Sequence, residues 1–405
     1  MVQRWLSTSL VVLMLCTSSC GDGGGAGGLA GVGGVGGTLG GTGTTSILYV
    51  TNSGSNNVSG YTINSVTGVL AAISGSPFPT GSWPSAMAVS SNGFFAYVAN
   101  GQANTVTAFR ISTEGGLLIV LPTTDNPNPV SVGTAPSALA ISPDTQHLYV
   151  ASRSSATVTA FTIGAGGVLT LVSPTGSNLN PVAVDGSAPE SLAISQNGKF
   201  LYAANSGSND ITAFSIASSG LLTKIPPAGS HANPLASGGT TLQGIAATPN
   251  ALFLYAVHSS SNTVTAFHIE SNGLLTLVPV SGTGQNPIPV GSSAPGVVLM
   301  SRNGRFLYSA NGGGTITAFS IGVDGLLSRV SSSGGQVNPV STGTSPIAMA
   351  VSLDGQYLYA ANSGGRVSAY TLSDDTGLLT PLSPLVGNPF LAGTSPSGIA
   401  TPGSP

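Results

Sequence analysis

The chain has 405 residues, of which 41% are hydrophobic and 5% are charged, and its formal net charge is −3. The hydrophobic residues are numerous enough to bury a large core, which argues against disorder despite the abundance of Gly, Ser, Thr, Asn and Pro. Nine Lys and Arg residues are too few for the basic surface that neutralises a phosphate backbone. We therefore expect a folded protein that does not bind nucleic acid.

Residues 1–20 have the pattern of a signal peptide. Arg4 precedes an apolar run over residues 10–16, which is too short to span a bilayer. The only two cysteines, Cys16 and Cys20, lie here, so disulfide and thiolate chemistry are excluded from the rest of the chain.

The end of this segment, three small polar residues followed by Cys20, resembles the lipobox of bacterial lipoproteins. The resemblance implies that Cys20 becomes a lipidated N-terminus, and Gly21 at the next position implies the outer membrane. A secreted protein with an incidental cysteine is the alternative. We therefore expect contact with a membrane through the lipid anchor alone.

Residues 21–45 are mostly Gly, Thr, Ala and Val, a composition typical of a flexible tether. They contain a G-x-G-x-x-G pattern at Gly31, Gly33 and Gly36. Because no predicted strand precedes it and no helix follows, the pattern does not indicate a dinucleotide site.

One tyrosine then recurs at intervals of 48 to 53 residues. Each period holds four strand-sized segments, which in the third copy are residues 137–142, 147–151, 157–163 and 168–172. No segment has a sustained helical period, and a repeat of this length is typical of a β-propeller blade. The seven copies of the tyrosine are Tyr49, Tyr97, Tyr149, Tyr202, Tyr255, Tyr308 and Tyr359.

The turns repeat as regularly as the strands. A glycine precedes the fourth segment of each copy, and Asn-Pro recurs in the longer connections. The first and second segments are joined by pairs that two-residue hairpins favour. These pairs are Asn92-Gly93, Asn197-Gly198, Asn303-Gly304 and Asp354-Gly355.

The two ends of the repeat region complement each other. The first copy begins at Ile47 and lacks a first segment, while residues 395–400 match the start of a copy and then stop. We predict that residues 396–400 pair beside residues 47–51 and close a seven-bladed ring. The predicted fold is an all-β, seven-bladed propeller of four-stranded antiparallel blades over residues 46–402.

Tyr49-Val50-Thr51-Asn52 resembles the YVTN propeller repeat of bacterial surface proteins. The whole repeat over residues 46–402, including Gly-Leu-Leu-Thr before the last strand, resembles the seven-bladed lactonase family, which includes 6-phosphogluconolactonase. The resemblance implies a propeller and, by its activity, a lactone hydrolase. Enzymes of that family carry a histidine after the proline that opens a blade, and no copy here has one, so the resemblance assigns no catalytic residue.

The four histidines, His147, His231, His258 and His268, have no partner at metal-ligand spacing. We interpret them as ordinary surface histidines and expect neither a metal nor a cofactor. The sequence also lacks the motifs of a nucleophile elbow, a phosphate loop or a zinc protease.

Candidate site residues are those where one copy departs from the others toward a polar or titratable side chain. After the tyrosine strand, His258 replaces the usual Asn and Arg153 a small residue; Asp210 replaces the usual Thr near the end of the same loop. Glu190 and Gln243 replace the small residue after the blade-opening position. Because chain direction puts these positions at one end of blades 3, 4 and 5, we predict a binding site there.

The predicted function is an exported cell-envelope lipoprotein, a monomer that binds a ligand or an envelope protein through its loops. A lactone hydrolase and a repetitive surface-coat protein are the alternatives. Solvated charges, or an Arg153–carboxylate pair that only ties two loops together, would explain the same residues without a site.

Overall fold

The computed structural model describes residues 46–402, apart from residues 114, 123–126, 177, 281, 283, 292–293 and 384–386. The predicted signal peptide, Cys20 and the tether lie outside the described residues. Those that are described belong to one compact unit, residues 44–405. Within this described part, no helix has the length and apolar character needed to cross a membrane.

Seven antiparallel sheets, the blades, each contain four strands and a short fifth one. The four strands are consecutive in the chain in every blade except blade 1, whose inner strand is β35. The inner strands are β35 (Pro396–Ala400) of blade 1, β5 (Pro84–Val89), β10 (Pro136–Ile141), β15 (Pro189–Ile194), β20 (Leu242–Ala247), β25 (Pro295–Met300) and β30 (Pro346–Val351). The second strands are β1 (Ser46–Asn52), β6 (Phe95–Asn100), β11 (His147–Ser152), β16 (Phe200–Asn205), β21 (Phe253–His258), β26 (Phe306–Asn311) and β31 (Tyr357–Asn362).

The outer half of each blade continues the meander. The third strands are β2 (Asn57–Ile63), β7 (Thr105–Ile111), β12 (Thr157–Ile163), β17 (Asp210–Ile216), β22 (Thr263–Ile269), β27 (Thr315–Ile321) and β32 (Arg366–Leu372). The fourth strands are β3 (Leu70–Ala72), β8 (Leu118–Val120), β13 (Leu169–Leu171), β18 (Leu222–Lys224), β23 (Leu275–Leu277), β28 (Leu327–Arg329) and β33 (Leu379–Pro381).

The fifth strand, which the sequence analysis did not anticipate, has two residues and pairs with the start of the third strand. Its copies are β4 (Phe78–Pro79), β9 (Val130–Ser131), β14 (Val182–Ala183), β19 (Leu235–Ala236), β24 (Ile288–Pro289), β29 (Val340–Ser341) and β34 (Phe390–Leu391).

The preceding Asn-Pro connection explains this fifth strand. In blade 3 the Asn180 side chain accepts a hydrogen bond from the Ala160 N–H (2.9 Å) and donates to the carbonyls of Ala160 and Val172 (2.8 Å each). The asparagine thus satisfies peptide groups between the third and fourth strands and holds the returning chain against the blade.

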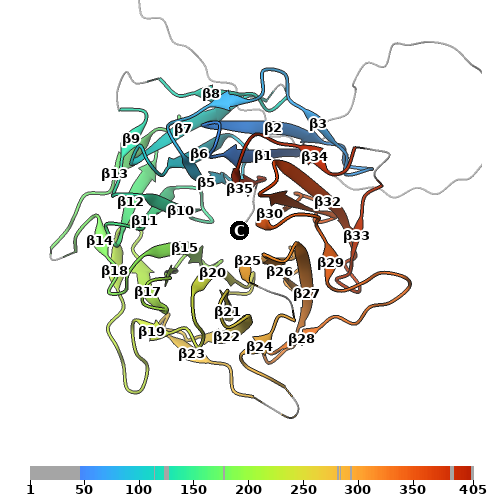
Figure 1. Ribbon diagram of the computed structural model, residues 1–405. Helices are drawn as coiled ribbons and strands as arrows, with labels where there is room; N and C mark the ends of the chain where they lie inside the picture. The colour runs from blue at the N-terminus through green and yellow to red at the C-terminus, as the bar shows by residue number, and fades with distance from the viewer. Residues whose placement is uncertain are drawn as a thin grey trace, which may run out of the picture. The chain divides into compact units, whose positions relative to one another are not determined.

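The ring closes through pairing of the two ends, as predicted. β35 pairs with β1, with Tyr49 opposite Ala400 and Val50 opposite Ile399. Figure 1 shows the inner strands around the centre of the ring, with β35 (red) beside β1 (blue). The seven-bladed all-β fold is therefore confirmed.

The hairpin between the inner and second strands is longer than predicted. In blade 2 the Ser90 N–H donates to the Phe95 carbonyl (2.9 Å), so four residues, 91–94, form the connection. The Asn92 side chain accepts from the Ser90 hydroxyl (2.6 Å) and the Phe94 N–H (3.0 Å). The Asn-Gly pair recurs in the turns of several blades because the asparagine side chain makes these hydrogen bonds and the glycine adopts a positive φ, and not because the turn has two residues.

The recurring tyrosine joins neighbouring blades. Each hydroxyl donates to the carbonyl of the glycine before the fourth strand of the next blade; Tyr255 to Gly325 (2.8 Å) is one example. Tyr359 of blade 7 donates to Gly68 of blade 1 (2.9 Å), which completes the circle. The other pairs are Tyr49–Gly116, Tyr97–Gly167, Tyr149–Gly220, Tyr202–Gly273 and Tyr308–Gly377.

The acceptor glycine is required by space as well as by conformation. Gly325 has a φ of +82°, and a Cβ on it would overlap the ring of Phe253, which lies against it from blade 5. The same contact recurs around the ring with Phe95, His147, Phe200, Phe306 and Tyr357. The repeat glycine is therefore the place where one blade receives both the hydroxyl and the ring of its neighbour.

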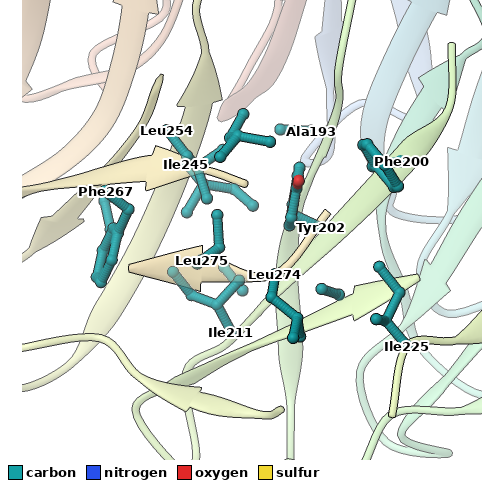
Figure 2. Packing of buried hydrophobic residues seen from close by; sticks show 14 of the residues in the cluster. Ala193, Phe200, Tyr202, Ile211, Ile225, Ile245, Leu254, Phe267, Leu274 and Leu275 are labelled. Atoms are coloured by element: carbon teal, nitrogen blue, oxygen red, sulfur yellow. The ribbon is translucent and has the colours of Figure 1, made fainter. Parts of the chain in front are cut away.

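Hydrophobic residues fill the space between adjacent blades. Figure 2 shows Tyr202 and Ile211 of blade 4 packed with Leu254 and Leu275 of blade 5. Because each blade presents apolar side chains on both faces, no blade can bury its surface alone, and stability depends on the complete ring.

We expect Gly325→Ala to lower the free energy of unfolding by about 3 kcal/mol, since it combines positive-φ strain with overlap on Phe253. Gly296→Ala is the matched control, because open space surrounds its Cβ position. Chemical denaturation of both variants measures the difference. Equal stabilities would mean that the inter-blade contact at Gly325 does not constrain the ring.

Candidate functional site

Strand register fixes where the five candidate residues lie. Across the inner and second strands, Pro136 faces Ser152, Pro189 faces Asn205 and Leu242 faces His258. These pairs end their blades on the side opposite the four-residue hairpins. We call this side the loop edge and the other the hairpin edge. Arg153, Glu190, Asp210, Gln243 and His258 all lie at the loop edge of blades 3, 4 and 5.

Arg153 and Glu190 form an ion pair between blades 3 and 4. The Arg153 Nε lies 2.8 Å from the Glu190 Oε1, with 57% of the arginine side chain and 21% of the glutamate side chain exposed. Burial raises the pKa of Glu190 above its ordinary value, and Arg153 offsets part of that rise. The arginine is too exposed for the pair to add more than about 1 kcal/mol of stability.

The second residue of the inner strand is a serine in blades 1 to 3, and Glu190 and Gln243 take its place in blades 4 and 5. These residues stand where the axis of the ring opens at the loop edge, which we call the channel mouth. Ser85 and Ser137 occupy the same position in blades 2 and 3, and each hydroxyl donates to the proline carbonyl of the next inner strand (2.6 Å). Ser397 makes the same bond to Pro84. These bonds tie blades 1 to 4 together. Only blades 4 and 5 carry a larger polar group at this position, since blades 6 and 7 carry Gly296 and Ile347.

Asp210 serves its own blade. Its Oδ1 accepts a hydrogen bond from the Asn205 amide (2.7 Å), and the same amide donates to Thr212 (2.9 Å). The carboxylate replaces the threonine that receives this asparagine elsewhere, as Thr105 does in blade 2. Within the described residues, no hydrogen bond or ion pair joins Asp210, Gln243 or His258 to the Arg153–Glu190 pair.

His258 is fully buried, and neither ring nitrogen makes a hydrogen bond of ordinary geometry in the described structure, although the backbone of Thr263 and of Ser237 lies close to the ring. It occupies the asparagine position of blade 5, and the loop at Gly239 lies so close that a Cβ there would overlap the ring. Thr265, which would receive the asparagine amide, is also unpartnered. Burial lowers the pKa of His258 to about 4.

The interpretation of all four histidines as surface residues is therefore wrong for two of them. His258 lies beneath a loop, and His147 is 6% exposed because its ring fills the inter-blade position that a phenylalanine fills in other blades. The sequence did not reveal that these two histidines are buried, because His147 begins its strand and His258 ends its strand, and both strand ends also carry polar residues in other blades. No group of three potential metal ligands occurs within the described residues.

Sequence reasoning missed Trp83, which lies at the loop edge of blade 2 with 51% of its surface exposed. Its φ of 57° matches the residue before the opening position in most other blades, where the side chain is small. The Trp83 N–H donates a hydrogen bond to the Asn56 side chain (2.7 Å), and the Trp83 carbonyl accepts one from the Gly101 N–H (2.7 Å). Its side chain is not titratable, but a tryptophan at a position where the other blades carry small residues is a signal visible in the sequence.

Comparison with known proteins agrees with this architecture. Residues 39–236 and 244–392 match the family described as lactonase, 7-bladed beta-propeller. The chain belongs to this lactonase family. A search of curated proteins gives no match to this member of the family.

Solved structures resemble this lactonase-family propeller at low sequence identity. A putative 6-phosphogluconolactonase from Bacteroides uniformis is 20% identical with a TM-score of 0.67, over 88% of this chain and 99% of that one. A periplasmic gluconolactonase from Pseudomonas aeruginosa is 19% identical with a TM-score of 0.67, over 89% and 99%. At such identities the likeness shows the fold alone.

We predict that His258→Asn removes a pH-dependent loss of stability. Because burial depresses the pKa of His258 from 6.5 to about 4, only the unfolded chain binds a proton between these values. This contribution is complete above pH 6.5 and is lost as the pH falls, by up to about 3 kcal/mol near pH 4. At pH 7 the asparagine also regains its amide bonds, worth about 1 kcal/mol.

Denaturation with urea at pH 7 and pH 4.5 measures both effects. His231→Asn, on a half-exposed side chain, is the control and should keep the wild-type pH dependence. If His258→Asn loses as much stability as the wild type on acidification, His258 is not buried in its neutral form.

Proposed function

We propose that this protein is an exported cell-envelope lipoprotein whose propeller binds a ligand or a protein partner through the loop edge of blades 3 to 5. The observation that carries the proposal is the Arg153–Glu190 pair across two blades at the channel mouth. Charged residues make up only 5% of the chain, so a carboxylate and a guanidinium at this rim give it a polarity that the surrounding Ser, Gly and Ala residues do not have.

The arrangement suits recognition of a polar molecule. Arg153 is exposed enough to donate further hydrogen bonds. Glu190 accepts hydrogen bonds when ionised and can also donate one when protonated, and its raised pKa favours the protonated form more than an ordinary glutamate does. Gln243 adds an amide from the next blade. Trp83 supplies an exposed aromatic face on the same edge of blade 2.

A lactone hydrolase is the second candidate, favoured by membership of the lactonase family. In that case Glu190 would act as the general acid or base, because burial at a mouth is the usual way to raise a carboxyl pKa for this role. His258 takes no part in either proposal, since it is fully buried and covered by the loop at Gly239 and cannot reach a molecule at the rim. Family membership supports the hydrolase as much as the binding module, and turnover by Glu190 separates the two.

The test of the site uses residues 44–405, the compact unit that contains every described strand and the ring closure. Thermal shifts with a panel of sugar acids and lactones, including 6-phosphogluconolactone, should reveal a stabilising compound. Glu190→Gln and Arg153→Gln should weaken its binding about tenfold or more, the scale of a lost charge-assisted hydrogen bond.

Asp375→Asn, an exposed carboxylate on the turn between β32 and β33, is the matched control and should bind as the wild type does. Turnover of the lactone that is abolished by Glu190→Gln would establish the hydrolase in place of a binding module. Binding that Glu190→Gln and Arg153→Gln leave unchanged would rule out this rim as the site.

The envelope location depends on Cys20. We predict that Cys20→Ala releases the protein from the membrane fraction, because the lipidated thioether would be its only attachment. Fractionation of cells that express each form checks this, with Cys16→Ala as the control that keeps the anchor. Membrane retention of the Cys20→Ala protein would exclude lipidation at this residue.

A further inference from the structure

A cavity of about 370 Å³ lies on the axis of the propeller, lined by inner strands of all seven blades. Its lining belongs to the half of each inner strand that leads to the hairpin edge, whereas Glu190 and Gln243 begin their strands at the loop edge. The cavity is therefore separate from the site proposed above. Its volume lies within the range of roughly 300 to 1,000 Å³ that small-molecule pockets occupy.

One position of the repeat makes this cavity aliphatic. The fourth residue of the inner strand is a large aliphatic side chain in all seven blades, and every one of them lines the cavity. These residues are Met87, Leu139, Leu192, Ile245, Val298, Met349 and Ile399. Leu139 and Leu192 remain only partly buried after the ring has closed, so apolar surface is still exposed along the axis.

The methionines strengthen this interpretation. Met87, Met300 and Met349 are the only methionines of residues 46–402, and all three line the cavity. An unbranched thioether side chain adjusts its rotamer to the shape of an apolar guest at little cost. All three are buried between blades and also line the cavity, so flexible side chains of the core form part of its wall.

Polar groups stand at one end of this space. Arg302 is the only charged residue of the lining; its Nε donates to the Ser352 carbonyl (2.7 Å) and its Nη2 to the Pro402 carbonyl (3.0 Å). The negative charge of the exposed Asp354 also attracts the Arg302 guanidinium, but Asp354 does not line the cavity. The half-buried guanidinium is thus fixed at the hairpin edge, where it favours an anionic group over a cationic one.

We propose that the axial cavity binds an aliphatic chain with an anionic head, such as a carboxylate, with the chain among the seven aliphatic side chains and the head toward Arg302. Each inner strand pairs on one side only, and its free edge faces the axis. The peptide groups on these free edges need water or another polar partner. A single narrow chain leaves room for water along the wall, whereas a bulky apolar guest would exclude it, so the chamber suits the narrow chain.

The test uses residues 44–405 with N-phenyl-1-naphthylamine, a neutral dye that fluoresces in apolar sites, and with decanoate as competitor. We expect saturable binding of the dye at one site and its displacement by decanoate. Decyltrimethylammonium, with the same chain and the opposite charge, should compete about tenfold less well. Equal competition by the two would contradict the assignment of the head group to Arg302.

Variants that fill the chamber make the test specific. Ala88 and Ala140 are half-buried lining residues at a position where blade 6 carries Leu299, so leucine is already accommodated there by this fold. The Ala88→Leu/Ala140→Leu double variant should lose at least about tenfold in dye and decanoate affinity while its melting temperature stays near that of the wild type. Ala71→Leu, on the exposed outer strand β3, is the control.

If the double variant does not fold, Ala140→Leu alone and a crystal structure with a brominated decanoate decide the question. Bromine density between the inner strands would place the chain in the cavity. Absence of saturable binding to the wild type, or unchanged binding in a folded filled variant, would overturn the proposal.

Discussion

The ring depends on the contact that each blade makes with the glycine turn of the next one. A buried tyrosine hydroxyl meets a glycine carbonyl seven times, from Tyr49 around to Tyr359, and in most copies an aromatic ring covers the same glycine. Each such hydrogen bond is worth about 1 kcal/mol, but leaving a buried hydroxyl or carbonyl unpaired costs more. The contact therefore fixes the rotation of each blade against its neighbour, and hydrophobic packing supplies most of the free energy.

This contact explains why the repeat could be recognised in the sequence. The tyrosine, the glycine and the Asn-Pro are each needed by geometry: a hydroxyl at a set height, a positive φ beneath a ring, and an amide that satisfies three peptide groups. The tyrosine and the glycine recur in all seven blades and the Asn-Pro in six, with Ser76-Pro77 in blade 1. These positions were enough to predict the blade count and the pairing of β35 with β1. The fifth strand was not predictable because two residues carry no periodic pattern.

The site was less accessible to sequence reasoning because a departure from the repeat has several physical outcomes. Asp210 exchanges one hydrogen-bond acceptor for another inside its blade, and His258 is buried by a loop whose glycines leave room for its ring. Of the five candidate residues, Arg153 and Glu190 meet as an ion pair near the surface. A sequence shows that a residue is unusual, but burial and neighbours decide whether it stabilises the fold or remains available to a ligand.

The same repeat gives the axis two chemically different ends. At the loop edge the second position of the inner strand varies from Ser137 to Glu190 and Gln243, and its side chains reach the mouth without entering the inter-blade core. Two positions later every blade carries an aliphatic residue, because that position must pack against the neighbouring blade as the ring closes. Variation is thus physically tolerated at the mouth and restricted at the hairpin-edge half of the axis. A propeller of this kind can change its polar specificity at one end while its apolar chamber is maintained by the folding requirement itself.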